Sequence, residues 1–261
     1  MPSRFTQKRR DRQRSQPFPA AWLAVLDGNV PLYRALTPEH QERVRGDIRV
    51  LLAEKHFEGC GGLQLDDEIQ VTIAAHGALL MLGGEPHYFP GLTSILVYPS
   101  TLLLPSRERT GPIEIEGKLP ISGVAARDVM VVSWEDAKAS AREAHDGQNL
   151  ILHELAHHLD FEDGRADGTP YLQGRSQYAA WARAMKPAFE WLRDHPDGDV
   201  IRAYGATNPA EFFAVVTEIF FERPDELLER HPDVYAALSR YYGLDLASKP
   251  SGRATPEGHG G

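Results

Sequence analysis

Cysteine is almost absent from this chain of 261 residues, which contains Cys60 alone. A single thiol cannot form an internal disulfide, so the fold must be stabilised by its core rather than by covalent cross-links. This usage is typical of a reducing compartment, and we expect the protein to be cytoplasmic. Cys60 lies in a Gly59-Cys60-Gly61-Gly62 turn, where we expect a small loop residue without a catalytic role.

Long apolar runs are also missing. No run reaches the roughly 18–20 residues that a membrane-spanning helix needs. Ala20–Leu26 follows a basic leader, as the apolar part of a signal peptide would, but it is short and ends at Asp27. The sequence therefore predicts neither a membrane segment nor a membrane partner, and it contains no internal repeat.

Positive charge is scarce outside the N-terminus. Residues 1–14 carry a net charge of +5, so the remaining chain carries −14 to give −9 overall. We expect residues 1–19 to be a disordered basic tail, and the acidic body argues against direct nucleic-acid binding by the folded domain. Residues 247–261, rich in Gly, Pro and Ser, are predicted to be a second disordered tail, which leaves one domain over residues 20–246.

The most specific motif is His153-Glu154-Leu155-Ala156-His157, inside an apolar, helix-forming run. On a helix, His153 and His157 project from one face about one turn apart, which suits a single zinc ion. Glu154 could accept a proton from a water on the metal as that water attacks a carbonyl. The motif predicts a zinc-dependent peptidase; the alternative is an exposed helix that carries these residues without a metal.

A catalytic zinc site usually has three protein ligands and a water. Asp160 and Asp163 stand where an extended metzincin motif would have Gly and His, so the third ligand must come from elsewhere. Glu211 is one candidate, in a helix predicted to begin with Asn208 as N-cap and Pro209 as first residue. Glu211 fits equally well as the acidic residue of a capping box with Asn208.

Three further carboxylates stay open at this point. Glu218 follows Glu211 by seven residues on the same helix face, among apolar neighbours, which suggests a partner that orients a ligand imidazole. Asp160 competes as a ligand because it is close in sequence. Asp167 competes because the Asp167-Gly168-Thr169 turn is similar to turns in zinc peptidases that use an aspartate ligand.

These residues give the chain a resemblance to the Mlc titration factor A family of bacterial zinc peptidases, which are similar to the catalytic domain of anthrax lethal factor. The resemblance is carried by residues 153–160 and by Tyr204…Asn208-Pro209-Ala210-Glu211-Phe212-Phe213-Ala214-Val215. It extends to Ile95–Pro99 and Val131–Trp134, and it covers most of residues 20–245.

The resemblance implies that His153, His157 and Glu211 bind one zinc ion, that Glu154 is the general base, and that Tyr204 lies close to the metal. The hydroxyl of Tyr204 could stabilise an oxyanion; the alternative is a half-buried aromatic residue before a helix.

The family name points to a second class of function. It comes from sequestering a transcriptional repressor of sugar-uptake genes. The partner is therefore either a peptide or protein substrate or a Mlc-like repressor, with peptidase activity secondary in the latter case. A purely structural zinc would need a fourth protein ligand.

The expected fold is α+β and of zincin type, with a cleft between a small strand-bearing lobe and a mainly helical lobe. Extended patterns are Thr93–Tyr98, Ile113–Glu116 and Asp128–Trp134, the last predicted to be an edge strand that lines the cleft and could pair with a peptide. Helices are predicted from residue 38, from residue 66, and over residues 135–144, 148–160, 173–193, 209–222 and 232–241.

Overall fold

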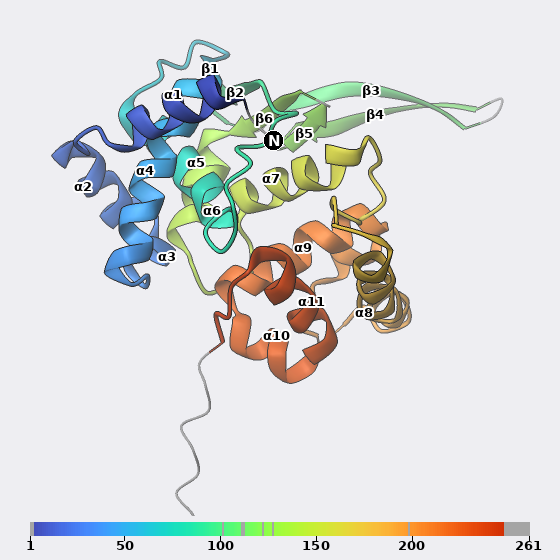
Figure 1. Ribbon diagram of the computed structural model, residues 1–261. Coiled ribbons are helices and arrows are strands. Elements are labelled where there is room, and N and C mark those ends of the chain that lie inside the picture. The colour runs from blue at the N-terminus through green and yellow to red at the C-terminus, as the bar shows by residue number, and fades with distance from the viewer. Residues whose placement is uncertain are drawn as a thin grey trace, which may run out of the picture.

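The computed structural model describes residues 3–100, 102–110, 113–121, 123–126, 128–197 and 199–247 (Figure 1). The α-helices are α1 (Arg4–Arg14), α2 (Ala20–Asn29), α3 (Pro31–Arg34), α4 (Pro38–Glu54), α5 (Asp67–Leu80), α6 (Trp134–Arg142), α7 (Leu150–Asp160), α8 (Arg175–Asp194), α9 (Pro209–Glu222), α10 (Pro224–Arg230) and α11 (Pro232–Tyr242). Two short 3₁₀ helices are η1 (Phe161–Asp163) and η2 (Ala203–Ala206). The strands are β1 (His56–Gly59), β2 (Ser94–Tyr98), β3 (Leu102–Thr110), β4 (Ile113–Ile121), β5 (Gly123–Ala126) and β6 (Val129–Ser133).

A small mixed sheet has the strand order β1-β2-β6-β5, in which β1, β2 and β6 are parallel and β5 is antiparallel to β6. Strands β3 and β4 pair separately as an antiparallel ribbon. The combination of many helices with one small sheet confirms the predicted α+β class. One expectation is wrong: the segment 128–134 is not an edge strand, because β6 lies between β2 and β5, and β5 occupies the edge.

Helix starts are the best-predicted features. Thr37 caps α4 by accepting a hydrogen bond from the His40 amide, and Asp66 caps α5 by accepting one from the Ile69 amide. Such local signals do not depend on the rest of the fold. Helices α2, α3 and α10 and strands β1, β3 and β5 were not predicted, although α10 has usable signals: Pro224 at its start, acidic residues in its first turn and Arg230 in its last.

The expected disorder of residues 1–19 is wrong for residues 4–14, which form α1. No residue of this helix is buried, yet it packs on α4 through ion pairs. Arg10 lies 2.8 Å from Glu54, and Arg14 lies 2.8 Å from Asp47, a fully buried carboxylate. Arg9, Arg10 and Arg14 are thus matched by acids of the domain. The predicted C-terminal tail falls, from residue 248 on, outside the described residues.

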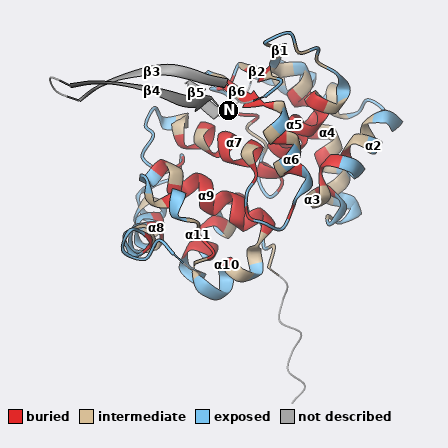
Figure 2. Ribbon diagram, turned by 180° about the vertical axis from the view of Figure 1, so that it is seen from behind, coloured by how far each residue is buried: buried red, intermediate tan, exposed pale blue. Residues whose placement is uncertain are grey.

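Helix α7 lies at the centre of the molecule, between the sheet and α9 (Figure 1). Nearly every residue of α7 is buried, and so are all residues of α9 except Pro209 and Glu211 (Figure 2). Two buried helices therefore carry the motif residues of the sequence, face to face. Within the described part of the chain, no helix has the length and apolar character needed to cross a bilayer.

Candidate metal centre

The two histidines of the motif lie on one face of α7. Asn149 begins this helix, and its side chain accepts a hydrogen bond from the Leu152 amide at 3.1 Å. The imidazole rings of His153 and His157 lie 4.8 Å apart, and their Nε2 atoms are 3.2 Å apart. The i, i+4 spacing thus brings the two nitrogens together as predicted.

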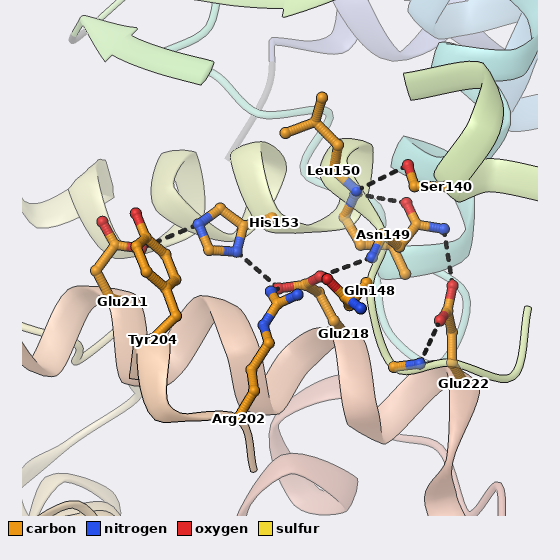
Figure 3. Close-up of polar contacts among 12 residues, drawn as sticks. Ser140, Gln148, Asn149, Leu150, His153, Arg202, Tyr204, Glu211, Glu218 and Glu222 are labelled. Carbon is orange, nitrogen blue, oxygen red and sulfur yellow. Dashed lines mark hydrogen bonds and ion pairs between the residues drawn. The ribbon is translucent and has the colours of Figure 1, made fainter. Parts of the chain in front are cut away.

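Glu211 comes from the first turn of α9. Asn208 is the N-cap and accepts a hydrogen bond from the Glu211 amide at 3.0 Å, as in the capping alternative. The Glu211 carboxylate, however, points toward the imidazole of His153 (Figure 3). Its Oε2 lies 3.0 Å from Nε2 of His153 and 3.5 Å from Nε2 of His157. Asn208 therefore caps the helix while the side chain of Glu211 faces the histidines.

The spacing of these three atoms fits a metal ion. Ligands at about 2.0–2.2 Å from a tetrahedral zinc lie about 3.3 Å from one another; the observed separations are 3.0, 3.2 and 3.5 Å. Among the described residues, His153, His157 and Glu211 are the one group of His, Cys, Asp or Glu with this convergence. Asp160 and Asp167, the competing candidates, do not join it; Asp160 accepts a hydrogen bond from the Gly168 amide at 2.9 Å instead.

Glu218 orients His153. Its Oε1 lies 2.7 Å from Nδ1 of His153; in the neutral ring with its proton on Nδ1, Nε2 directs its lone pair at Glu211 and His157. Lone pairs that converge at this distance repel one another unless a cation or a proton lies between them. The second oxygen of Glu218 accepts from the backbone amide of Asn149 at 2.6 Å. Glu218 thus ties the histidine and the start of its helix to α9.

Two further residues of this network were not predicted. The guanidinium of Arg202 pairs with Oε1 of Glu218 (Figure 3). Glu222, one turn beyond Glu218, accepts from Asn149 Nδ2 at 3.0 Å and from the Gly147 amide at 3.1 Å. The four-residue spacing of Glu218 and Glu222 was a usable signal for a common face. Arg202 had none, because single arginines are common on surfaces.

Burial and hydrogen bonding between charged groups shift the pKa values of this site in opposite directions. Burial lowers the pKa of His153, but its hydrogen bonds to Glu211 and Glu218 outweigh this and raise it to about 9. Burial would raise the pKa of Glu211, yet the hydrogen bonds from both histidines hold it well below its usual range. At Glu222 burial dominates and raises the pKa to about 8. The cluster therefore favours an added positive charge between Glu211 and the two rings.

Glu154 and Tyr204 border the cluster in different ways. Glu154 is 4% exposed, its Oε2 has no hydrogen-bond partner among the described residues, and burial raises its pKa although both histidines act in the opposite direction. Tyr204 lies in η2, is 52% exposed, and has its ring 5.9 Å from that of His153. Burial and the neighbouring Glu211, to which it is hydrogen-bonded, raise the pKa of Tyr204 to about 12, so its hydroxyl keeps its proton.

Comparisons with known proteins identify the family of the chain. Residues 5–243 match the family described as glucose-regulated metallo-peptidase M90. Proteins named Mlc titration factor A are 32% identical: that of Edwardsiella ictaluri over 257 residues, with 94% of each chain covered, and that of Yersinia pestis over 235 residues, with 87% of this chain and 85% of the relative covered. An uncharacterized protein of Synechocystis sp. is 35% identical over 238 residues, 88% of this chain and 86% of the relative. The chain therefore belongs to the M90 family of metallopeptidases.

Proposed function

We propose that the protein is a zinc-dependent peptidase of zincin-type fold, with one zinc ion held by His153, His157 and Glu211. The observation that carries the proposal is the convergence of three ligand atoms at separations of 3.0 to 3.5 Å. The donor set of two imidazoles and one carboxylate leaves a fourth position for water or substrate, as catalytic rather than structural zinc sites do.

The surrounding residues have distinct roles in this proposal. Zinc, when bound, would polarise the scissile carbonyl and acidify a water molecule. Glu154 would accept the proton of the attacking water and pass it to the leaving amine; burial raises its pKa, which suits a group that must both take and give a proton. Tyr204 donates its hydroxyl to the developing oxyanion. Glu218 keeps the Nδ1 proton on His153, so that Nε2 stays a lone-pair donor.

Membership of a metallopeptidase family implies a peptide substrate. We propose that the substrate pairs with the sheet edge formed by β5, which lies alongside α7. Backbone hydrogen bonds to an edge strand hold an extended peptide with little demand on its side chains. Extended peptides should therefore be cleaved far better than blocked single amino acids, and equal turnover of both would favour a small exopeptidase pocket instead.

The first experiment separates metal binding from chemistry. We expect wild type to hold one zinc per chain and to cleave a mixed peptide library. Glu154→Gln should retain zinc and lose at least about 100-fold in kcat, the usual contribution of general acid–base catalysis. Glu190→Gln, at a solvent-exposed carboxylate of α8, is the control for loss of a negative charge. Activity that survives Glu154→Gln would show that another group is the base.

A second candidate function rests on the names of the relatives, which are called Mlc titration factors. The protein would then bind a Mlc-like repressor in the cytoplasm, with peptidase activity secondary. Co-purification with wild type and Glu154→Gln separates the two. Binding that is unaffected by the substitution supports a regulator, whereas a protein that is cleaved by wild type and retained by Glu154→Gln is a substrate.

A further inference from the structure

Gly168 lies where three elements meet. It belongs to the segment that joins α7 to α8, and its backbone has φ +76°, a left-handed conformation that glycine adopts without strain. Its amide donates to Oδ2 of Asp160, the last residue of α7, at 2.9 Å. Its carbonyl accepts from the indole Nε1 of Trp181 in α8 at 3.0 Å. Asp160 and Trp181 are both buried, so Gly168 is fixed to α7 and α8 by two protected hydrogen bonds.

The third element is α9. A Cβ atom on Gly168 would lie 2.2 Å from the carbonyl oxygen of Pro209 and 3.1 Å from its Cβ. Pro209 is the first residue of α9 and precedes Glu211 by two positions. The start of α9 therefore packs directly against the backbone of Gly168, where a side chain would not fit. An open pocket of about 310 Å³ is lined by Gly168, Trp181 and Pro209 among others.

This contact bears on the metal centre because the three ligands come from two helices. His153 and His157 belong to α7, whereas Glu211 is in the first turn of α9. A non-bonded carbon needs about 3.5 Å, so any side chain at 168 would have to move the start of α9 by about 1 Å. Metal–ligand bonds tolerate about 0.2 Å. Gly168 therefore sets a separation between α7 and α9 at which the Glu211 carboxylate lies within metal-binding distance of the two histidines.

We propose that Gly168, held by Asp160 and Trp181, is a positioning residue of the metal centre: it places Glu211 relative to the two histidines. The inference rests on the proposed zinc site but not on peptidase activity. A side chain at 168 should weaken zinc binding by displacing one ligand, without removing any ligand atom.

The test compares Gly168→Ala with Gly62→Ala. Gly62 has φ +85°, and a Cβ there meets nothing within 4 Å, so it controls for left-handed strain alone. Readouts are zinc affinity by competition with a chelator, the visible absorption spectrum of the Co²⁺-substituted protein, which reports coordination geometry, and thermal unfolding of the metal-free forms. We expect Gly168→Ala to bind zinc at least tenfold more weakly than Gly62→Ala, because residues that orient metal ligands contribute on this scale. We also expect Gly168→Ala to alter the absorption spectrum of the Co²⁺-substituted protein.

Trp181→Phe provides the test if Gly168→Ala does not fold. It removes the donor to the Gly168 carbonyl and keeps an aromatic ring in place, so we expect a smaller loss of zinc affinity and a cobalt spectrum changed in the same direction. Zinc affinity and a cobalt spectrum equal to wild type in whichever of these variants folds would overturn the inference. If wild type binds zinc tightly and these substitutions weaken that binding, but wild type cleaves no peptide, the inference on Gly168 is supported and the proposed peptidase function is refuted.

Discussion

The two ends of α7 are attached to α9 in different ways. At the N-terminal end, charged groups are concentrated: Glu218 and Glu222 of α9 accept hydrogen bonds from Asn149 and from backbone amides, and Arg202 pairs with Glu218. At the C-terminal end, Asp160 accepts a hydrogen bond from the backbone amide of Gly168, which touches Pro209 of α9. The N-terminal end therefore controls the protonation and orientation of His153, and the C-terminal end controls the distance to Glu211.

This comparison explains why the carboxylates of α9 gather where they do. The N-terminus of α7 carries the positive end of the helix dipole and unpaired amides, which stabilise anions. Buried Glu218 accepts from the amide of Asn149, the N-cap residue of α7, whereas Glu222 accepts from the Gly147 amide just before the helix. The opposite end of α7 carries the negative end of the dipole, and there burial raises the pKa of Asp160 to about 6.

The largest effect should follow Glu218→Ala. The substitution leaves the His153 Nδ1–H, the Asn149 amide and the Arg202 guanidinium without their shared partner. We expect a loss of about 3–5 kcal/mol in unfolding free energy, as for breaking a buried ion pair, and a 10- to 100-fold loss of zinc affinity. Urea unfolding and chelator competition measure the two; zinc affinity equal to wild type would contradict a role of Glu218 in orienting His153.

Asn149→Ala should have the next largest effect. It removes the N-cap of α7 and the donor to Glu222, and we expect about 1–2 kcal/mol of destabilisation together with weaker zinc binding. Thr37→Ala removes the N-cap of α4, remote from the metal centre, and serves as the matched control. Equal zinc affinity in the two variants would mean that the N-terminal end of α7 does not position His153.

Glu222→Gln should change how stability depends on pH. Because burial raises the pKa of Glu222 to about 8, this carboxyl contributes stability that is fully present below about pH 4.5 and is lost as the pH rises through about 8. The free energy of unfolding of Glu222→Gln relative to wild type should therefore increase from pH 5 to pH 9. If the difference in unfolding free energy between Glu222→Gln and wild type stays constant from pH 5 to pH 9, Glu222 does not titrate in this range.

The smallest effect is expected at α1, far from both ends of α7. Arg10→Gln removes the ion pair with Glu54, and we expect a loss of about 0.5–1 kcal/mol that shrinks with added salt. Zinc affinity and peptide cleavage should equal those of wild type. A salt-independent loss would show that α1 is held by packing of its side chains over Tyr88 rather than by charge.

The sequence predicted those parts of the site that depend on local geometry. The spacing of His153 and His157 fixes their common face in any helix, and Asn208-Pro209 marks a helix start wherever it occurs. The residues alone left Glu211 undecided between cap and ligand, and the family resemblance favoured the ligand, because the approach of α9 to α7 is not visible in the local pattern. Glu218 was expected to orient a ligand, since a carboxylate among apolar neighbours needs a partner.

The remaining features depend on which segments meet in three dimensions. Residues 4–14 were expected to be disordered because the acids that pair with their charges, Asp47 and Glu54, lie more than thirty residues away in the sequence. The local sequence does not reveal such partners. The edge position was assigned to the segment 128–134 because no pattern revealed β5. Gly168 looked like an ordinary turn residue, and its contact with Pro209 exists only in the folded chain.

The most direct test of the central claim is the zinc affinity of Glu211→Gln measured beside wild type. We expect wild type to bind one zinc per chain and the variant to bind at least tenfold more weakly, because an amide oxygen replaces a charged ligand. Unchanged affinity and stoichiometry in the variant would contradict the proposed metal centre and would direct attention to another carboxylate.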